Sequence, residues 1–155
     1  MSSNEAASFR TREYRPGDFP TLCLLDQMCF PEGIAYTPEE IALGLAQPGA
    51  FVLVAEVENQ VVAFLLAYQK KRPVGHIVTI DVHPDFRQRG IGYQLMELAE
   101  QRLRQGGAMR IVLEVSVEND PALQFYAKRG YLTRRLLPHY YRNESDAYLM
   151  EKMLP

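Results

Sequence analysis

The stretch HIVTIDVHPDFRQRGIGYQLMELAEQRL, residues 76–103, decides the fold that we expect for this chain. It starts with an apolar, largely β-branched run, continues through a His-Pro turn and a basic segment with two glycines, and ends in an amphipathic pattern. This order predicts a strand, a loop and the N-terminus of a long helix. Gly90 and Gly92 fall where the helix should begin, so backbone N–H groups there are neither covered by side chains nor yet paired within the helix. Such a site attracts anions.

Arg87 and Arg89 add positive charge to the same loop. Phosphate oxygens use guanidinium groups and backbone N–H donors together, so the loop predicts a phosphorylated cofactor. The alternative is a plain strand-to-helix turn with solvated arginines. Two familiar phosphate motifs are excluded, because no Gly-Lys-Ser/Thr follows and the third position after Gly92 is Leu95.

The segment RQRGIG, residues 87–92, resembles the Arg/Gln-x-x-Gly-x-Gly/Ala signature of the GCN5-related N-acetyltransferases. In that family the signature also lies between a strand and a long helix, and its amides hold the pyrophosphate of acetyl-CoA. The resemblance therefore implies acetyl-CoA as the cosubstrate.

Length and charge narrow the class of protein. The chain has 155 residues, of which 47% are hydrophobic and 23% charged, so we expect one globular domain, residues 1–155. A net charge of −2 argues against nucleic-acid and anionic-membrane binding, because both need a basic face. Residues 1–8 are polar and expected to be flexible. With no secretory signal and no apolar run long enough for a bilayer, we expect a cytoplasmic protein, either a monomer or a homodimer.

The two cysteines, Cys23 and Cys29, fall in or near one helical segment and lack CxxC spacing. Reduced packing thiols are therefore expected, not a disulfide or a metal site. The three histidines are scattered along the chain, so no metal is predicted.

The rest of the chain alternates short strands with helices. The expected strands are 9–14, 51–57, 61–68, 76–82, 109–117, 131–136 and 147–153, and the expected helices run from 18 to about 28, from 37 to about 46, from the glycine turn to 106, and from 120 to 128. This order indicates a mixed α/β domain. The family resemblance further implies one mostly antiparallel sheet of about seven strands, flanked by four helices and splayed between its fourth and fifth strands.

The first helix carries two local predictions. Asp18 is expected to cap it, and Leu22, Leu25 and Met28 are expected to form its buried stripe.

Glu114 is a carboxylate within an apolar strand, IVLEVSV at residues 111–117. A charge there needs water, a partner or a cleft. The pattern leaves three alternatives open: a solvent-facing residue, an ion pair with a nearby arginine, or a general base, because partial desolvation raises a carboxylate pKa toward neutrality.

Asn119 and Tyr126 belong to the segment that follows. Pro121 suits the first helical position, so Asp120 is the expected cap and Asn119 is left to contact a ligand; a cap formed by Asn119 is the alternative. Tyr126 lies about two turns into the helix, where a tyrosine is most often a core residue with its hydroxyl at the edge.

The segment LEVSVENDPALQFYAKRGY, residues 113–131, is similar to a stretch of the ribosomal-protein alanine acetyltransferases and of related catalytic subunits of protein N-terminal acetyltransferases. Phe125 replaces a leucine that is usual there. In those bacterial enzymes the glutamate accepts a proton, the tyrosine donates one to the leaving thiolate, and the asparagine contacts the cofactor. The resemblance thus implies Glu114 and Tyr126 as catalytic residues. The cofactor-binding residues that it implies are Ile80, Asp81, Val82, Arg87, Gln88, Arg89, Gly90, Ile91, Gly92, Tyr93, Asn119 and Tyr126.

The chain's end resembles the Tyr-Tyr…Asp-Ala…Met ending of the same group. This likeness implies a peptide-binding side formed by Phe30, Pro31, Glu32, Tyr140 and Tyr141. Two departures concern the acceptor: residues 33–37 read GIAYT where Pro-Trp-Ser is usual, and Asp81 stands where a small residue is common.

The expected activity is acetyl-CoA-dependent N-acetylation by direct transfer in a ternary complex. Backbone groups of Ile80 and Val82 would pair with the pantetheine arm like an added strand and polarise the thioester. The favoured acceptor is the N-terminal α-amine of a peptide or protein, ribosomal proteins included. A small amine, such as an amino acid, polyamine or aminoglycoside, is the second candidate, and a non-catalytic acyl-CoA-binding module is the third.

Overall fold

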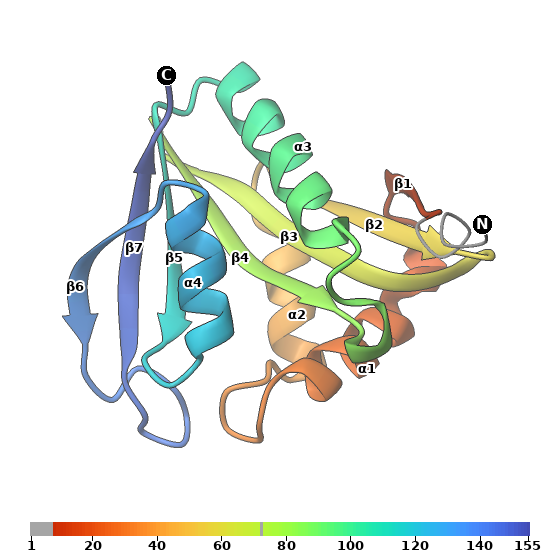
Figure 1. Ribbon diagram of the computed structural model, residues 1–155, viewed down its shortest axis with the longest axis horizontal. Coiled ribbons are helices and arrows are strands. Elements are labelled where there is room, and N and C mark those ends of the chain that lie inside the picture. Colours follow the sequence, from red (N-terminus) through yellow and green to blue (C-terminus); the bar gives the residue numbers. More distant parts are fainter. Residues whose placement is uncertain (1–7, 72) are drawn as a thin grey trace.

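A seven-stranded sheet in the order β1-β2-β3-β4-β5-β7-β6 forms the centre of the structure (Figure 1). The computed structural model describes residues 8–71 and 73–155, so all but one of the residues expected to be flexible, 1–8, lie outside the described part. The strands are β1 (Arg10–Glu13), β2 (Phe51–Val57), β3 (Gln60–Lys71), β4 (Val74–Val82), β5 (Arg110–Ser116), β6 (Leu132–Leu137) and β7 (Ala147–Met153). The helices are α1 (Phe19–Cys29), α2 (Pro38–Leu45), α3 (Ile91–Gln105) and α4 (Asp120–Lys128), with 3-10 turns η2 (Pro16–Asp18) and η3 (Pro84–Phe86). The predicted order of elements is confirmed.

Neighbouring strands are antiparallel except β4 and β5. These two run parallel and pair only over Val74–His76 of β4 and Arg110–Val112 of β5. Beyond that point they diverge, as Figure 1 shows. The predicted splay between the fourth and fifth strands is therefore confirmed.

Helices cover both faces of the sheet (Figure 1). On one face α3 and α4 pack over a core that includes Leu65 of β3 and Leu95 of α3. On the other face α1 packs over Phe64 of β3 through Leu22. Because both of its faces are buried, β3 reads in the sequence as an unbroken apolar run, without the alternation of a half-exposed strand.

A bulge in β4 changes which face its side chains occupy. Ile77 pairs with Ala67, whereas Thr79 pairs with the preceding residue of β3, so Val78 is the extra residue. One extra residue reverses the alternation of the side chains that follow. Ile77 accordingly packs in the core under α3, while Asp81 meets α1 on the opposite face.

Two features of α1 correct the predictions made for it. Met28 is 50% exposed, and the buried stripe is formed by Leu22, Leu25 and Asp26. Asp18 stands at the helix start but makes no capping hydrogen bond through its side chain. Its carboxylate instead accepts from both terminal nitrogens of Arg12 at 2.9 and 3.0 Å.

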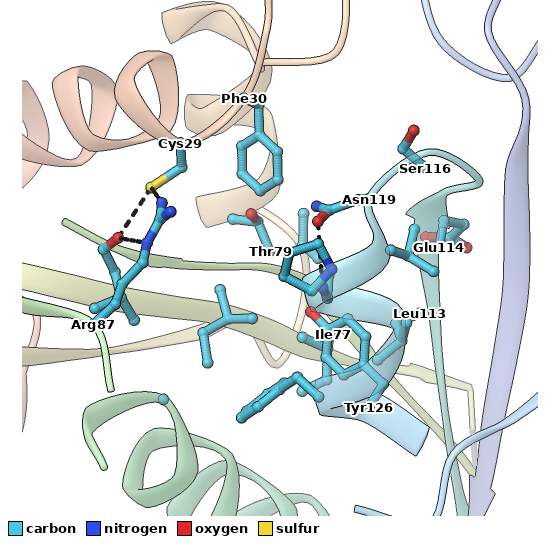
Figure 2. Close-up of a pocket in the computed structure, with 18 of the residues that line it drawn as sticks. Cys29, Phe30, Ile77, Thr79, Arg87, Leu113, Glu114, Ser116, Asn119 and Tyr126 are labelled. Carbon is cyan, nitrogen blue, oxygen red and sulfur yellow. Dashed lines mark hydrogen bonds between the residues drawn. The ribbon is translucent and has the colours of Figure 1, made fainter. Parts of the chain in front are cut away.

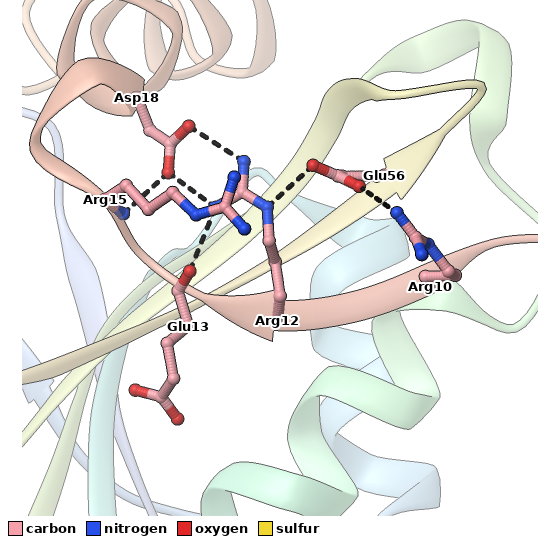
Figure 3. A network of polar contacts seen from close by, with 6 residues as sticks. All are labelled: Arg10, Arg12, Glu13, Arg15, Asp18 and Glu56. Atoms are coloured by element: carbon pink, nitrogen blue, oxygen red, sulfur yellow. Dashed lines mark hydrogen bonds and ion pairs between the residues drawn. The ribbon is translucent and has the colours of Figure 1, made fainter.

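Arg12 connects three elements at the N-terminal edge of the sheet. Its guanidinium lies between Asp18 and Glu56 of β2, with Nε 2.6 Å from the Glu56 carboxylate (Figure 3). The guanidinium beside Asp18 lowers the pKa of that carboxyl below its usual value. This pairing fixes the short strand β1 and the turn η2 to the sheet.

Two carboxyl groups meet in the core between α1 and β4. Asp26 and Asp81 are both completely buried. The Tyr36 N–H donates to Asp26 Oδ2 at 2.6 Å, and the Thr79 hydroxyl donates to Asp81 Oδ1 at 2.7 Å. Burial and the hydrogen bond with the Asp26 carboxyl raise the pKa of Asp81 well above its ordinary value, against a smaller opposite effect of Arg87. Two buried carboxyls in contact are stable only if they share a proton.

We expect the Asp81→Asn variant to gain stability over the wild type as the pH rises. The pKa of Asp81 is raised by folding, so its contribution to stability is complete below the pKa of the unfolded chain and is lost as the pH rises through the folded pKa. An asparagine amide donates to Asp26 at any pH. Thermal unfolding from pH 5 to pH 8 should show the difference in Tm moving in favour of the variant, with exposed Asp85→Asn as the control. A pH-independent difference would contradict the shared proton.

Candidate active site

A pocket of about 510 Å³ opens where β4 and β5 separate. Its walls come from β4, β5, the start of α3 with the loop before it, α4, the end of α1 with the loop after it, and the β6–β7 loop. In Figure 2 Cys29 and Arg87 lie on one side of this pocket and Glu114 on the other. The incomplete pairing of two strands thus brings residues together that are far apart in the sequence.

The N-terminus of α3 forms the first end of the pocket. Gly90 precedes the helix with a left-handed φ of +84° and provides no side-chain cap. A Cβ built at Gly90 would meet no atom within 4 Å. The first-turn N–H groups of α3 are therefore open to a ligand, and together with the Arg87 guanidinium they fit a pyrophosphate.

The loop residues expected to bind the cofactor lie around this end with one exception. Arg89 does not line the pocket; its guanidinium stacks 4.9 Å from the centre of the Phe86 ring and donates to the Asp85 carbonyl at 3.4 Å. The loop residues that line the pocket are Arg87, Gln88, Gly90, Ile91, Gly92 and Tyr93.

The edge of β4 forms the floor between the two ends. The His83 N–H bonds the Val62 carbonyl on the β3 side, and successive residues of a strand point to opposite edges. The backbone groups of Ile80 and Val82 therefore point to the open edge, and both residues line the pocket. Asp81, expected among the cofactor residues, has its side chain outside the pocket, in the core with Asp26.

The Val82 carbonyl is already engaged by two neighbours. Arg87 Nε donates to it at 2.9 Å, and the Cys29 thiol donates to it at 3.4 Å (Figure 2). Burial raises the pKa of the Cys29 thiol to about 11. Cys29 is thus a packed thiol at the wall of the pocket, and both cysteines are free.

Glu114 lines the second end of the pocket, and His76 supports it from behind without lining the pocket itself. His76 Nε2 lies 2.8 Å from Glu114 Oε1, and each side chain is 13% exposed. His76 is the last residue of β4 that pairs with β5, so this contact lies at the fork between the two strands. Because the buried Nδ1 atom has no partner among the described residues, the tautomer with hydrogen on Nε2 fits best, and it donates to the carboxylate.

Two tyrosines of the β6–β7 loop lie beside this end. Tyr140 hydrogen-bonds with Glu114, and burial together with that carboxylate raises the pKa of Tyr140 to about 12. Tyr141 lines the pocket, and its ring packs edge-on against Tyr140 at 4.9 Å. Of the three early residues expected to bind the acceptor, only Phe30 lines this pocket. Glu32 lines a neighbouring cavity of about 340 Å³.

Tyr126 and Asn119 approach the pocket from α4. Tyr126 is 8% exposed, lines the pocket, and has its pKa raised by burial. Asn119 also lines the pocket, but it caps α4 by accepting from the Ala122 N–H at 3.2 Å. The predicted cap at Asp120 is therefore wrong, and the alternative is correct.

The sequence pattern of the acetyltransferase (GNAT) family matches residues 18–131. This chain belongs to the GNAT family of acetyltransferases. It is 29% identical over 160 residues to the N-alpha-acetyltransferase of Sulfurisphaera tokodaii. The alignment covers 96% of this chain and 95% of the relative.

Two solved structures have the same fold as this chain. Ard1 from Thermoplasma volcanium aligns with a TM-score of 0.87 and 29% identity over 95% of this chain and 98% of its own. The ribosomal-protein-S18-alanine N-acetyltransferase of Escherichia coli aligns with a TM-score of 0.81 over 94% of each chain. Its 19% identity supports the fold alone.

The structure places two residues at the candidate site that the sequence analysis did not single out. His76 was treated as one of three scattered histidines, and only the pairing of β4 with β5 places it beside Glu114. Tyr36 lines the pocket from the loop after α1, and burial raises the pKa of its phenol. Its one signal in the sequence was the departure from Pro-Trp-Ser at residues 33–37.

Within residues 8–71 and 73–155, no group of three or more His, Cys, Asp or Glu side chains could hold a metal ion. Among the helices of the described residues, none combines the length and apolar character needed to cross a membrane.

We expect the Gly90→Ala variant to bind acetyl-CoA at least about tenfold more weakly, because a methyl group would enter the open space in front of the α3 amides. Calorimetric titration with acetyl-CoA measures this loss. Gly49→Ala is the matched control, since Gly49 also has a positive φ, +76°, but lies in the turn before β2. Both variants carry backbone strain. Equal affinities for the two would contradict a phosphate site at Gly90.

Proposed function

We propose that this chain is an acetyl-CoA-dependent acetyltransferase for the N-terminal α-amines of peptides or proteins. The observation that carries this proposal is one pocket with the uncapped start of α3 at one end and Glu114, hydrogen-bonded to His76, at the other. Cosubstrate and acceptor can therefore meet within one cavity, as direct transfer in a ternary complex requires.

The chain's own groups fit the cosubstrate along the whole pocket. Amides at the start of α3 and the Arg87 guanidinium would bind the pyrophosphate. The open edge of β4 at Ile80 and Val82 would pair with the amides of the pantetheine arm, in the way that a peptide adds to a sheet edge. When bound, acetyl-CoA supplies the acetyl group as a thioester.

Glu114 is suited to accept the proton of the incoming ammonium, since it is a largely desolvated carboxylate at the acceptor end. His76 holds that carboxylate in place by hydrogen bonding to Oε1. As the amine attacks the thioester carbon, a C–N bond forms, the C–S bond breaks and the sulfur leaves as a thiolate. The Tyr126 hydroxyl, which is protonated at neutral pH, donates a hydrogen bond and then a proton to that sulfur.

The acceptor class rests on the aromatic walls and on the relatives. Phe30, Tyr36 and Tyr141 line the pocket, and Tyr36 and Tyr141 lie near the Glu114 carboxylate, which suits the first side chain of a peptide. The relative from Sulfurisphaera tokodaii is named an N-alpha-acetyltransferase, and this chain aligns with nearly its full length. The two free cysteines fit the reducing cytoplasm, where nascent protein N-termini are present.

Mass spectrometry of the purified protein with acetyl-CoA and two peptide pools tests this function. One pool has free α-amines and begins with Ala, Ser, Met or Thr, and a ribosomal-protein N-terminal peptide is added to it. The other pool is blocked at the α-amine and has free lysines. We expect acetylation in the first pool alone.

Each other outcome contradicts the proposal and identifies its alternative. Acetylation of lysines only, or of polyamines and amino acids only, would assign the site to a different amine. Binding of acetyl-CoA without turnover on any amine would indicate a binding module.

The proton-transfer roles predict different behaviour for two isosteric variants. Glu114→Gln should be slow at pH 7, with a deficit that narrows as the pH rises above about 8, where an α-amine is already deprotonated. Tyr126→Phe should lower kcat by roughly tenfold to a thousandfold at every pH. Kinetics of peptide acetylation from pH 6 to pH 9.5 measure both effects.

Two matched controls belong to this experiment. Glu118→Gln changes an exposed carboxylate near the same strand, and Tyr131→Phe removes a buried hydroxyl that donates to Glu100 at 2.8 Å. Neither should change kcat. If Glu114→Gln retains wild-type turnover at pH 7, Glu114 is not the base, and if Tyr126→Phe does so, its hydroxyl serves packing only.

A further inference from the structure

One peptide group in the loop between α1 and α2 is held from both sides. The Tyr36 N–H donates to Asp26 Oδ2 at 2.6 Å, and Arg142 Nη2 donates to the Ala35 carbonyl at 2.6 Å. These are the N–H and the C=O of the same peptide bond, between Ala35 and Tyr36. A carboxylate on α1 and an arginine on the β6–β7 loop therefore fix the plane of this one peptide group.

Arg142 also binds the start of α2. Its Nη1 atom donates to Glu40 Oε1 at 2.6 Å. The same Glu40 oxygen accepts from the Thr37 N–H at 2.8 Å in the capping box of α2. One guanidinium thus reaches the loop after α1 and the helix that follows it.

The two loops also approach each other closely at Gly33 and Asn143. Gly33 has a φ of +90°, and a Cβ built on it would lie 2.6 Å from the Cβ of Asn143. Only a glycine allows this approach. The loop of residues 30–37 and the loop of residues 138–146 are therefore packed directly against each other next to Arg142.

These two loops carry an aromatic wall of the pocket, in which Tyr36 and Tyr141 lie near the Glu114 carboxylate. Phe30 and Tyr36 come from the first loop and Tyr141 from the second. Tyr36 directly follows the clamped peptide group, so the plane of that group sets the direction of its side chain.

We propose that Arg142 is a positioning residue that sets the affinity for the acceptor, by holding the Ala35–Tyr36 peptide group and hence the aromatic wall. This inference rests on the proposed function for the identity of the acceptor. Arg142 acts through Tyr36 and touches neither the anion site nor Glu114. Arg142 is therefore expected to change the affinity for the acceptor and to leave the affinity for acetyl-CoA unchanged.

The chemistry of arginine fits this role. The guanidinium is a planar fork whose separate N–H groups bind Ala35 and Glu40 in fixed directions, which a lysine ammonium cannot reproduce. The Arg142 side chain is 47% exposed, and exposed ion pairs contribute little to stability. Its removal should therefore disturb loop geometry more than folding.

Steady-state kinetics of three variants test the proposal. Arg142→Ala should raise the KM for the peptide about tenfold, the size expected for one lost charge-assisted hydrogen bond, and leave the KM for acetyl-CoA unchanged. The peptide KM of Arg142→Lys should lie between the values of the wild type and of Arg142→Ala. Arg134→Ala is the matched control, because Arg134 is 48% exposed and pairs with Glu151 on the sheet, away from the pocket. It should match the wild type.

Amide hydrogen exchange provides a readout that needs no acceptor. The Tyr36 amide and its neighbours in residues 31–37 should exchange faster in Arg142→Ala than in the wild type or Arg134→Ala, with α3 unchanged. Unchanged loop exchange, an unchanged peptide KM, or an equal rise in the KM of both substrates would overturn the proposal. If the wild type acetylates no peptide, the proposed function fails, and the exchange data alone decide whether Arg142 holds the loop.

Discussion

The structure depends on how briefly β4 and β5 pair. They share backbone contacts over three residues of each strand and then separate. Beyond that point, alternate residues of β4, Ile80 and Val82 among them, point backbone groups to an open edge that a ligand can use. The same separation forms the pocket and leaves His76 and Glu114 facing each other at the fork. The position of the candidate active site is thus set by the residue at which the parallel pairing of β4 with β5 ends.

The bulge at Val78 lets one strand serve both the core and the site. Before the bulge, Ile77 packs under α3, and after it Asp81 points to α1. This reversal directs the pocket-side residues Ile80 and Val82 toward the α3 side, where they contact that core. It also puts a carboxyl group where an apolar residue would ordinarily fill the interior. A local irregularity in the ladder therefore fixes both the position of the ligand edge and the need for a buried acid pair.

Local patterns in the sequence predicted the helices, the strands and the glycine turn before α3, whereas contacts between distant parts of the chain could not be predicted from them. The glycine turn before α3 was readable because its strand, loop and helix are contiguous in the chain. The partner of Glu114 could not be predicted, because it depends on the register between β4 and β5. The sequence suggested an arginine as that partner, whereas the structure has His76. Arg142 carried no signal either, because two loops about a hundred residues apart must pack before its targets exist. Met28 was predicted to be buried, but the polar Asp26 occupies the buried position in the last turns of α1 and Met28 faces solvent.

The Asp26–Asp81 pair makes folding itself a proton-uptake reaction. In the unfolded chain both carboxyls ionise near their ordinary pKa values and are charged at neutral pH. Burial and the neighbouring Asp26 carboxyl raise the pKa of Asp81 in the folded chain, so folding takes up hydrogen ions from the buffer at pH values between the unfolded and the folded pKa of Asp81. The measured heat of folding then includes the heat with which the buffer releases those ions. The enthalpy of folding of this protein is therefore a property of the solution as well as of the chain.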